Sequence, residues 1–226
     1  MNRSLYILLL TLLSISAEAQ INELGIFAGG ANYIGDIGPT DYVAPHDPAI
    51  GIMYRWNRSP RHSWRASFTY AKISSDDADS EISGRSQRGL SFENTIKELS
   101  AGMEFSFFDF NLHDSGFKVT PYVYSGVSYF WFDDKHFNNG VTINNDSKGA
   151  LAIPMVVGIK AHIARDWILG FEVGARYTFT DNLDGSNPEK DNEVFSFGNR
   201  DSKDWYVFSG FTLSYTFTDK PCYCAQ

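Results

Sequence analysis

Apolar and polar residues alternate with a period of two in eight segments of this chain. In the last segment, the apolar positions are Trp205, Val207, Phe211, Leu213, Tyr215 and Phe217. A two-residue period places successive side chains on opposite faces of a β-strand. The predicted strands are Glu23–Tyr33, Ala49–Trp56, Trp64–Lys72, Lys97–Phe107, Val119–Phe132, Ala150–Ala161, Trp167–Phe179 and Trp205–Phe217.

Strands with one apolar face fit a soluble sandwich, which buries that face, or a barrel in lipid, which turns it outward. The connections decide between the two, because short ones alternate with long ones. The short ones are 57–63, 108–117 and 162–166, and the long ones are 34–47, 73–95, 133–149 and 180–204. This alternation predicts an all-β fold, an eight-stranded antiparallel outer-membrane β-barrel with short periplasmic turns, long extracellular loops and both termini periplasmic. Trp56, Trp64 and Trp167 would form an aromatic girdle on the periplasmic side.

The first residues have the pattern of a secretory signal peptide. A positive charge at Arg3 precedes the apolar run Leu5–Ile15, and Ala17-Glu18-Ala19 precedes Gln20. Such a run is too short for a membrane-spanning helix. We therefore expect a signal peptide at 1–19, the barrel at 20–217 and a periplasmic tail at 218–226.

Charged residues alternate with the apolar ones on the inward face of the predicted barrel. They are Arg55, Arg65, Glu98, Glu104, Lys160, Glu172 and Arg176. The lumen of an eight-stranded barrel is just wide enough to be filled by side chains, and an unpaired charge there would be costly. We expect these residues to form ion pairs that plug the lumen. The alternatives are an ion path or a catalytic pair of carboxylates.

Net charge and motifs limit the chemistry further. The formal net charge is −8, which argues against nucleic acid as a partner. Carboxylates cluster in the long loops, at 76–81 and 181–193, where they indicate a charged surface and, as an alternative, a calcium site. No nucleophile motif or phosphate-binding loop is present. We therefore expect a non-enzymatic protein with no cofactor and no metal.

Two cysteines, Cys222 and Cys224, follow the last predicted strand. A zinc site with His62, His113 and His162 would not match the usual ligand spacing. A bond between the two cysteines would close a strained ring, and exposed thiols seldom stay free in an oxidising compartment. A disulfide to another protein is therefore a hypothesis for this tail.

Three stretches of the sequence resemble PorG-type proteins of the type IX secretion system. The first is Gly25–Gly38, and the second is Tyr54–Arg61. The third consists of Pro154, Gly158, Lys160, Trp167, Gly170, Glu172, Gly174 and Arg176, followed by Thr180–Asp184. The third departs from the family pattern at Asn182, where an aromatic residue is expected.

The resemblance implies an outer-membrane barrel that contacts a periplasmic ring built from a lipoprotein and its partner, the PorK and PorN type. It carries no catalytic residues. The barrel would anchor this ring through its periplasmic turns and tail, and Arg58, Arg61, Cys222 and Cys224 are the candidate contact residues. Arginine suits such a contact because it forms two-point pairs with carboxylates.

Two other functions are open to a small barrel in the outer membrane. One is transport of an apolar solute into the membrane through a pocket lined by Tyr122, Tyr124, Phe130 and Phe132. The other is surface attachment through long loops, in which Gly84, Gly89, Gly140 and Gly198 indicate flexibility.

Overall fold

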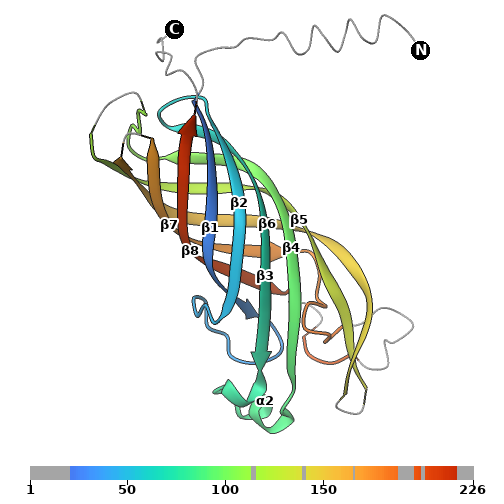
Figure 1. Ribbon diagram of the computed structural model, residues 1–226. Coiled ribbons are helices and arrows are strands. Elements are labelled where there is room, and N and C mark those ends of the chain that lie inside the picture. Colours follow the sequence, from blue (N-terminus) through green and yellow to red (C-terminus); the bar gives the residue numbers. More distant parts are fainter. Residues whose placement is uncertain are drawn as a thin grey trace, which may run out of the picture.

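The computed structural model describes residues 21–112, 116–138, 141–164, 166–187, 196–199 and 202–217 (Figure 1). The strands are β1 (Ile21–Ile34), β2 (Asp47–Asn57), β3 (His62–Asp76), β4 (Ser91–Ser106), β5 (Lys118–Asn138), β6 (Val141–Ala164), β7 (Trp167–Thr178) and β8 (Trp205–Phe217). A 3₁₀ turn, η1 (Asp77–Asp79), and a short helix, α2 (Ser83–Arg88), connect β3 to β4. No helix in the described ranges is long and apolar enough to cross a membrane.

The eight strands form one closed barrel in which every strand pairs antiparallel with its neighbours in sequence. Strand β1 also pairs with β8, from Asn22 opposite Phe217 to Ile34 opposite Trp205, and this pairing closes the ring. The predicted fold is therefore confirmed. Because the number of strands is even, Ile21 and Phe217 lie at the same end, which we call the turn end. The opposite end carries α2 and is called the loop end (Figure 1).

Several strands extend further toward the loop end than the sequence pattern predicts. β3 continues to Asp76, β4 begins at Ser91, and β5 and β6 extend to Asn138 and Val141. The predicted long loop at 133–149 is therefore wrong, since most of it is a hairpin of β5 and β6. Polar residues interrupt the apolar alternation along this extension, so apolar periodicity could not reveal it, whereas pairing with the neighbouring strand supplies its hydrogen bonds.

The outer surface carries a belt of exposed apolar side chains. Ile50, Ile52, Leu99, Val157 and Phe211 are each more than half exposed. Water does not tolerate a continuous apolar belt on a monomer, whereas lipid does. Trp56 lies opposite Trp64 near the turn end, and Trp167 packs edge-on against Tyr215 at 5.2 Å. These features define a transmembrane barrel with aromatic residues at one rim.

Two pairs of glycines lie opposite each other in neighbouring strands, Gly102 with Gly126 and Gly29 with Gly210. A Cβ atom on Gly102 would lie 2.2 Å from the Ser125 carbonyl oxygen, and one on Gly29 would lie 2.1 Å from that of Ser209. A side chain cannot fit at these distances. The two seams, β4–β5 and β1–β8, are diametrically opposed in the ring, so the glycines allow close backbone approach on opposite sides.

Candidate functional site in the lumen and at the two ends of the barrel

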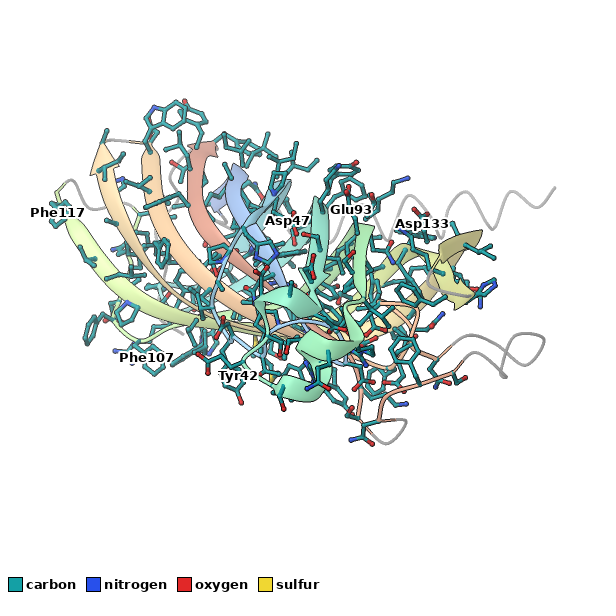
Figure 2. The ribbon with its side chains drawn as sticks, turned by 90° about the horizontal axis from the view of Figure 1, so that it is seen from below. Tyr42, Asp47, Glu93, Phe107, Phe117 and Asp133 are labelled. Atoms are coloured by element: carbon teal, nitrogen blue, oxygen red, sulfur yellow. The ribbon has the colours of Figure 1, made fainter. Side chains whose placement is uncertain are left out.

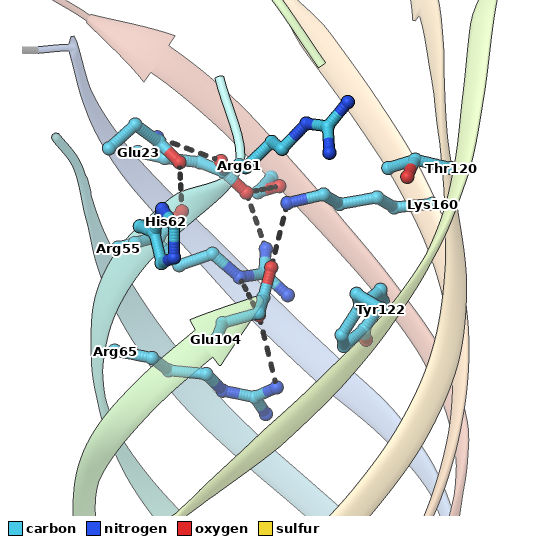
Figure 3. Close-up of polar contacts among 12 residues, drawn as sticks. Glu23, Arg55, Arg61, His62, Arg65, Glu104, Thr120, Tyr122 and Lys160 are labelled. Atoms are coloured by element: carbon cyan, nitrogen blue, oxygen red, sulfur yellow. Dashed lines mark hydrogen bonds and ion pairs between the residues drawn. The ribbon is translucent and has the colours of Figure 1, made fainter. Parts of the chain in front are cut away.

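The part of the lumen nearest the turn end is filled by an ion-pair network (Figure 3). Arg55 Nε donates to Glu104 Oε2 at 2.8 Å, and Lys160 Nζ donates to Glu104 Oε1 at 2.7 Å. Arg55 also pairs with Glu23, which accepts a further hydrogen bond from the Ser214 hydroxyl. All four charged side chains are almost completely buried. Their mutual pairing offsets the cost of removing each charge from water.

A second ion pair crosses the lumen beside this network. Arg65 on β3 donates two hydrogen bonds, each of 2.7 Å, to the two carboxylate oxygens of Glu172 on β7. The Tyr122 hydroxyl donates to Glu172 Oε2 at 2.6 Å, and the Arg65 guanidinium lies 4.8 Å from the centre of the Tyr124 ring. An arrangement of two parallel bonds fixes both side chains, and this holds β3 to the opposite wall of the barrel.

The third ion pair lies nearer the loop end. Arg176 donates to both oxygens of Glu98, at 3.2 and 3.3 Å, and the Tyr206 hydroxyl donates to Glu98 Oε2 at 2.6 Å. The Phe208 ring lies 4.2 Å from the Arg176 guanidinium. The structure thus brings all seven residues of the predicted lumen set into paired contacts.

Sequence reasoning overlooked three members of these networks. Glu23 alternates with the outward residues Leu24 and Ile26, so periodicity could have placed it inside. Tyr122 is predicted above to line a pocket for an apolar solute and Tyr206 has no predicted role, whereas the hydroxyl groups of both donate to buried carboxylates.

A cluster of apolar residues covers the turn end of the lumen. Phe110 and Leu112, from the connection between β4 and β5, pack with Ile21 and Ile168 and are almost fully buried. The Phe110 N–H donates to the Pro60 carbonyl at 3.0 Å, and Lys160 Nζ lies 5.0 Å from the centre of the Phe110 ring. The predicted short turn therefore folds inward and covers the ion-pair network on its turn-end side.

The candidate partner-contact residues are only partly described. Arg58 is exposed between β2 and β3. The side chain of Arg61 is half exposed and its Nε pairs with Asp109 Oδ1 at 2.5 Å. This ion pair links two neighbouring turns on the exposed surface. Cys222 and Cys224 lie outside the described residues, as do the whole 218–226 tail and the predicted 1–19 signal peptide.

The histidines do not gather into a metal site in the described part of the chain. The His62 ring packs against Phe105 on the surface, whereas His162 is buried and bonds the Gly116 carbonyl at 3.1 Å. His113 lies outside the described residues. Within these described ranges, no group of three or more histidine, cysteine, aspartate or glutamate side chains is arranged to hold a metal ion.

The loop end is closed by segments that fold into the mouth of the barrel. Leu183 and Ile37 are fully buried in the apolar core formed with Ile73, Ile96 and Phe92. The Leu183 N–H donates to Asp204 Oδ2 at 2.8 Å, and its carbonyl accepts from Asn94 Nδ2 at 2.8 Å. The connection between β7 and β8 is therefore held in the mouth by its own backbone.

Asp184 and Asp204 share one tyrosine hydroxyl in this mouth. The Tyr33 oxygen lies 2.8 Å from Asp184 Oδ2 and 2.5 Å from Asp204 Oδ1. A hydroxyl has one proton to donate, so the contact with both is best satisfied when one carboxyl keeps its proton. Burial raises the pKa of Asp184, and burial together with the Asp184 charge raises that of Asp204. Burial also raises the pKa of Asp181 to about 6.

A buried aspartate, Asp77, fixes the connection between β3 and β4, and we call its set of hydrogen bonds the Asp77 latch. Asp77 is fully buried and accepts hydrogen bonds from the N–H groups of Gly38 and Leu90, at 2.9 and 3.0 Å, and from Arg88 Nε at 2.8 Å. Gly38 has a φ of +79°, a conformation that glycine adopts without strain. Burial favours the neutral acid, but the Arg88 and backbone donors hold the pKa of Asp77 below its ordinary value. Part of the predicted acidic cluster is thus a structural clamp.

The stretches that carry the family resemblance lie in two places. Tyr33 and Ile37 of the first stretch meet Leu183 and Asp184 of the third at the loop end. The second stretch, Tyr54–Arg61, runs to the turn end, where it supplies the Arg61–Asp109 pair.

From one end to the other, the lumen holds an apolar cap, ion pairs, aromatic side chains and a second cap. The fold and these contacts define the class of protein as a transmembrane β-barrel whose lumen is filled by its own side chains. The chain belongs to the family described as "Domain of unknown function (DUF6089)", whose model matches residues 2–226.

No curated protein sequence matches this chain significantly. Among solved structures, the chain is similar to Ail, the attachment invasion locus protein of Yersinia pestis, solved with the heparin analogue sucrose octasulfate. The identity is 10%, the TM-score is 0.48, and the match covers 88% of this chain and 99% of that one. A major outer membrane protein from Thermus thermophilus is similar at 13% identity, with a TM-score of 0.47 and coverage of 88% and 100%. The outer membrane protein AlkL is similar at 14% identity, with a TM-score of 0.46 and coverage of 94% and 96%.

Proposed function

We propose that this protein is a non-enzymatic, non-conducting barrel of the bacterial outer membrane that anchors a periplasmic complex of the type IX secretion system. The turn end faces the periplasm in this proposal, with both termini there. The partner is the ring of a lipoprotein and its companion, of the PorK and PorN type, as the sequence resemblance implies.

The filled lumen is the observation that carries the proposal. Buried ion pairs occupy it at two levels, and apolar residues cover it at both ends. A channel needs a continuous wet path, and these contacts leave none among the described residues. A barrel with a filled lumen acts through its surfaces, and this supports an anchoring role.

The turn end supplies a surface suited to this contact. Arg58 is exposed there, and the exposed Arg61–Asp109 pair presents both charges beside it. Because an exposed pair contributes little to stability, a partner carboxylate can replace Asp109 at small cost. The hypothesis of an intermolecular disulfide through Cys222 or Cys224 concerns the same end of the chain.

The alternative of apolar solute transport is less well supported. Its predicted lining residues, Tyr122, Tyr124, Phe130 and Phe132, are almost fully buried. The Tyr122 hydroxyl bonds Glu172, that of Tyr124 bonds Ser100, and Phe130 packs on Tyr206. Side chains engaged in this way fill space and do not line a pocket.

The alternative of surface attachment would use the loop end. Its predicted flexible glycines are partly ordered, because Gly84 lies within α2 and Gly89 caps its C-terminus with a φ of +66°. Gly198 is placed beside Asp36, and Gly140 lies outside the described residues. No described contact at this end indicates a particular surface ligand.

The test is an affinity purification of the tagged full-length protein from native outer membranes, with and without reductant, followed by mass spectrometry. The wild type should recover the ring proteins. Arg58→Glu and Arg61→Glu should lose them, because each places like charge against the partner's carboxylates. A band that shifts with reductant would support the disulfide hypothesis.

Lys72→Glu is the matched control. Its side chain is 44% exposed, against 50% for Arg61, and it also forms one surface ion pair, with Glu93, but at the loop end. This variant should recover the ring as the wild type does. A wild-type barrel recovered without ring proteins, under conditions that preserve the ring, would refute the secretion role.

A further inference from the structure

A row of outward side chains crosses four strands at the loop-end border of the apolar belt. Tyr70 on β3 pairs in register with Lys97 on β4, Lys97 with Trp131 on β5, and Trp131 with Gly149 on β6. Side chains directly opposite each other in an antiparallel sheet are in contact range. Lys97 is therefore flanked by two aromatic residues on the outer face of the barrel.

A hollow of about 250 Å³ lies at this row. Tyr70, Lys97 and Trp131 line it together with the hydroxyl-bearing residues Thr95 and Ser147. Gly149 has no side chain of its own, and the end of the Tyr129 ring occupies the space over that glycine. The hollow is therefore open on the outer surface and is bordered by one cation and several hydrogen-bond donors.

The position of Lys97 relative to the lipid is fixed by its own strand. The next outward residues toward the turn end are Leu99, Ala101 and Met103, all exposed. In the other direction come Thr95 and Glu93. Lys97 thus marks the boundary between acyl chains and headgroups, where aromatic rings gather and lysine reaches toward phosphate.

Lys97 is also free to bind an anion. Among the described residues it makes no ion pair, whereas Lys72, one row further out, is paired with Glu93 at 2.7 Å. Asp133 lines the same hollow, and its negative charge repels a bound anion. Its carboxylate sits one row beyond Lys97, level with Ser147, so it limits affinity without occupying the place beside the two aromatic rings.

We propose that this hollow binds the phosphate of a lipid in the leaflet at the loop end, with Lys97 as the cation. The Thr95 hydroxyl donates a hydrogen bond to the phosphate, and the aromatic rings of Tyr70 and Trp131 contact the glycerol region. The acyl chains lie along Leu99 and Val127, on the turn-end side of Lys97. This proposal needs only a barrel that spans a membrane and is independent of the secretion role.

The experiment uses native mass spectrometry of the full chain in mixed micelles with phosphatidylglycerol or phosphatidylcholine of identical acyl chains. The wild type should retain phosphatidylglycerol preferentially. Lys97→Gln should lower this preference about five-fold, the value for one cation near an anionic lipid surface. Lys97→Arg should retain it, and Asp133→Asn should increase it.

Lys72→Gln is the matched control, since it removes one charge from the same outer face but from a residue already paired with Glu93. It should keep the wild-type preference. Equal preference in the wild type and Lys97→Gln would overturn the proposal, and so would an equal loss in both lysine variants, which would indicate general surface charge. Heat-dependent gel mobility verifies that each variant forms the barrel.

Discussion

Arg65 and Glu172 form a two-point ion pair across the lumen, although 107 residues separate them in the chain. They belong to β3 and β7, which are not neighbours in the sheet. Their contact therefore connects opposite walls of the barrel. In Figure 2, Phe107 and Phe117 mark the turn end of the barrel, and Glu93 and Asp133 lie toward the loop end.

Breaking this pair on one side should be more harmful than removing it entirely. Arg65→Met leaves the Glu172 carboxylate buried without its partner, and we expect a loss of about 3–5 kcal/mol in the free energy of unfolding. The double variant Arg65→Met/Glu172→Met should recover most of it. Urea unfolding in phospholipid bilayers, followed by tryptophan fluorescence, measures both. Arg61→Met, at the exposed pair with Asp109, should change stability far less. A double variant less stable than the single one would contradict this account.

The filled lumen predicts that the protein does not conduct ions. Reconstituted in planar bilayers, the wild type should show no stepwise conductance, because paired side chains and two caps leave no continuous path for water among the described residues. Glu104→Ala together with Arg55→Ala and Phe110→Ala removes the centre of one network and part of the turn-end cap. This triple variant should still be blocked by Leu183 and the Glu98–Arg176 pair. Regular current steps in the wild type would refute the sealed lumen.

The segment at the loop-end mouth should release as the pH rises. The folded-state pKa values of Asp181, Asp184 and Asp204 are raised, so the docked segment binds protons more tightly than the released one. The stabilisation of the docked segment by these carboxyl groups is fully present below pH 3.8, the ordinary pKa of aspartate. It is lost as the pH rises, through about 6 for Asp181. Hydrogen exchange of the Leu183 amide, corrected for intrinsic rate, should be faster at about pH 8 than at about pH 5. Asp204→Asn should weaken this dependence.

The Asp77 latch should respond to pH in the opposite direction. Its folded-state pKa is lowered, so its contribution is present above the ordinary value of 3.8 and is lost as the pH falls through the lower folded value. The Leu90 amide, which donates to Asp77, should therefore lose protection only in strong acid. Leu90 and Leu183 amides that changed protection in the same direction would contradict one of the two assignments.

The glycine pairs predict where a single methyl group is not tolerated. Gly102→Ala places a Cβ atom 2.2 Å from the Ser125 carbonyl oxygen, so the seam between β4 and β5 must separate. We expect a loss of about 1–3 kcal/mol, the usual cost of overpacking. Gly84→Ala in α2, where a Cβ meets nothing within 4 Å, is the control and should be neutral or stabilising. Equal stability of the two variants would show that the backbone gives way without strain.

The strands in the apolar belt were predictable because lipid on one side and a polar lumen on the other impose a strict period of two. Positions such as Leu99 and Glu98 reveal their faces without any tertiary information. The extended ends of β5 and β6 were not predictable, since polar residues interrupt the apolar alternation there and pairing between the strands defines them.

The candidate site divides in the same way. The order of residues was enough to show that Arg65, Glu104 and Glu172 point inward, because parity along a strand is a local property. It could not show which charges pair, since partners on opposite walls depend on the closure and register of the whole barrel. It also left open that Leu183 enters the mouth and Phe110 covers the turn end. Connecting segments have no periodicity, and only the cavity that the closed barrel offers decides where their apolar residues are buried.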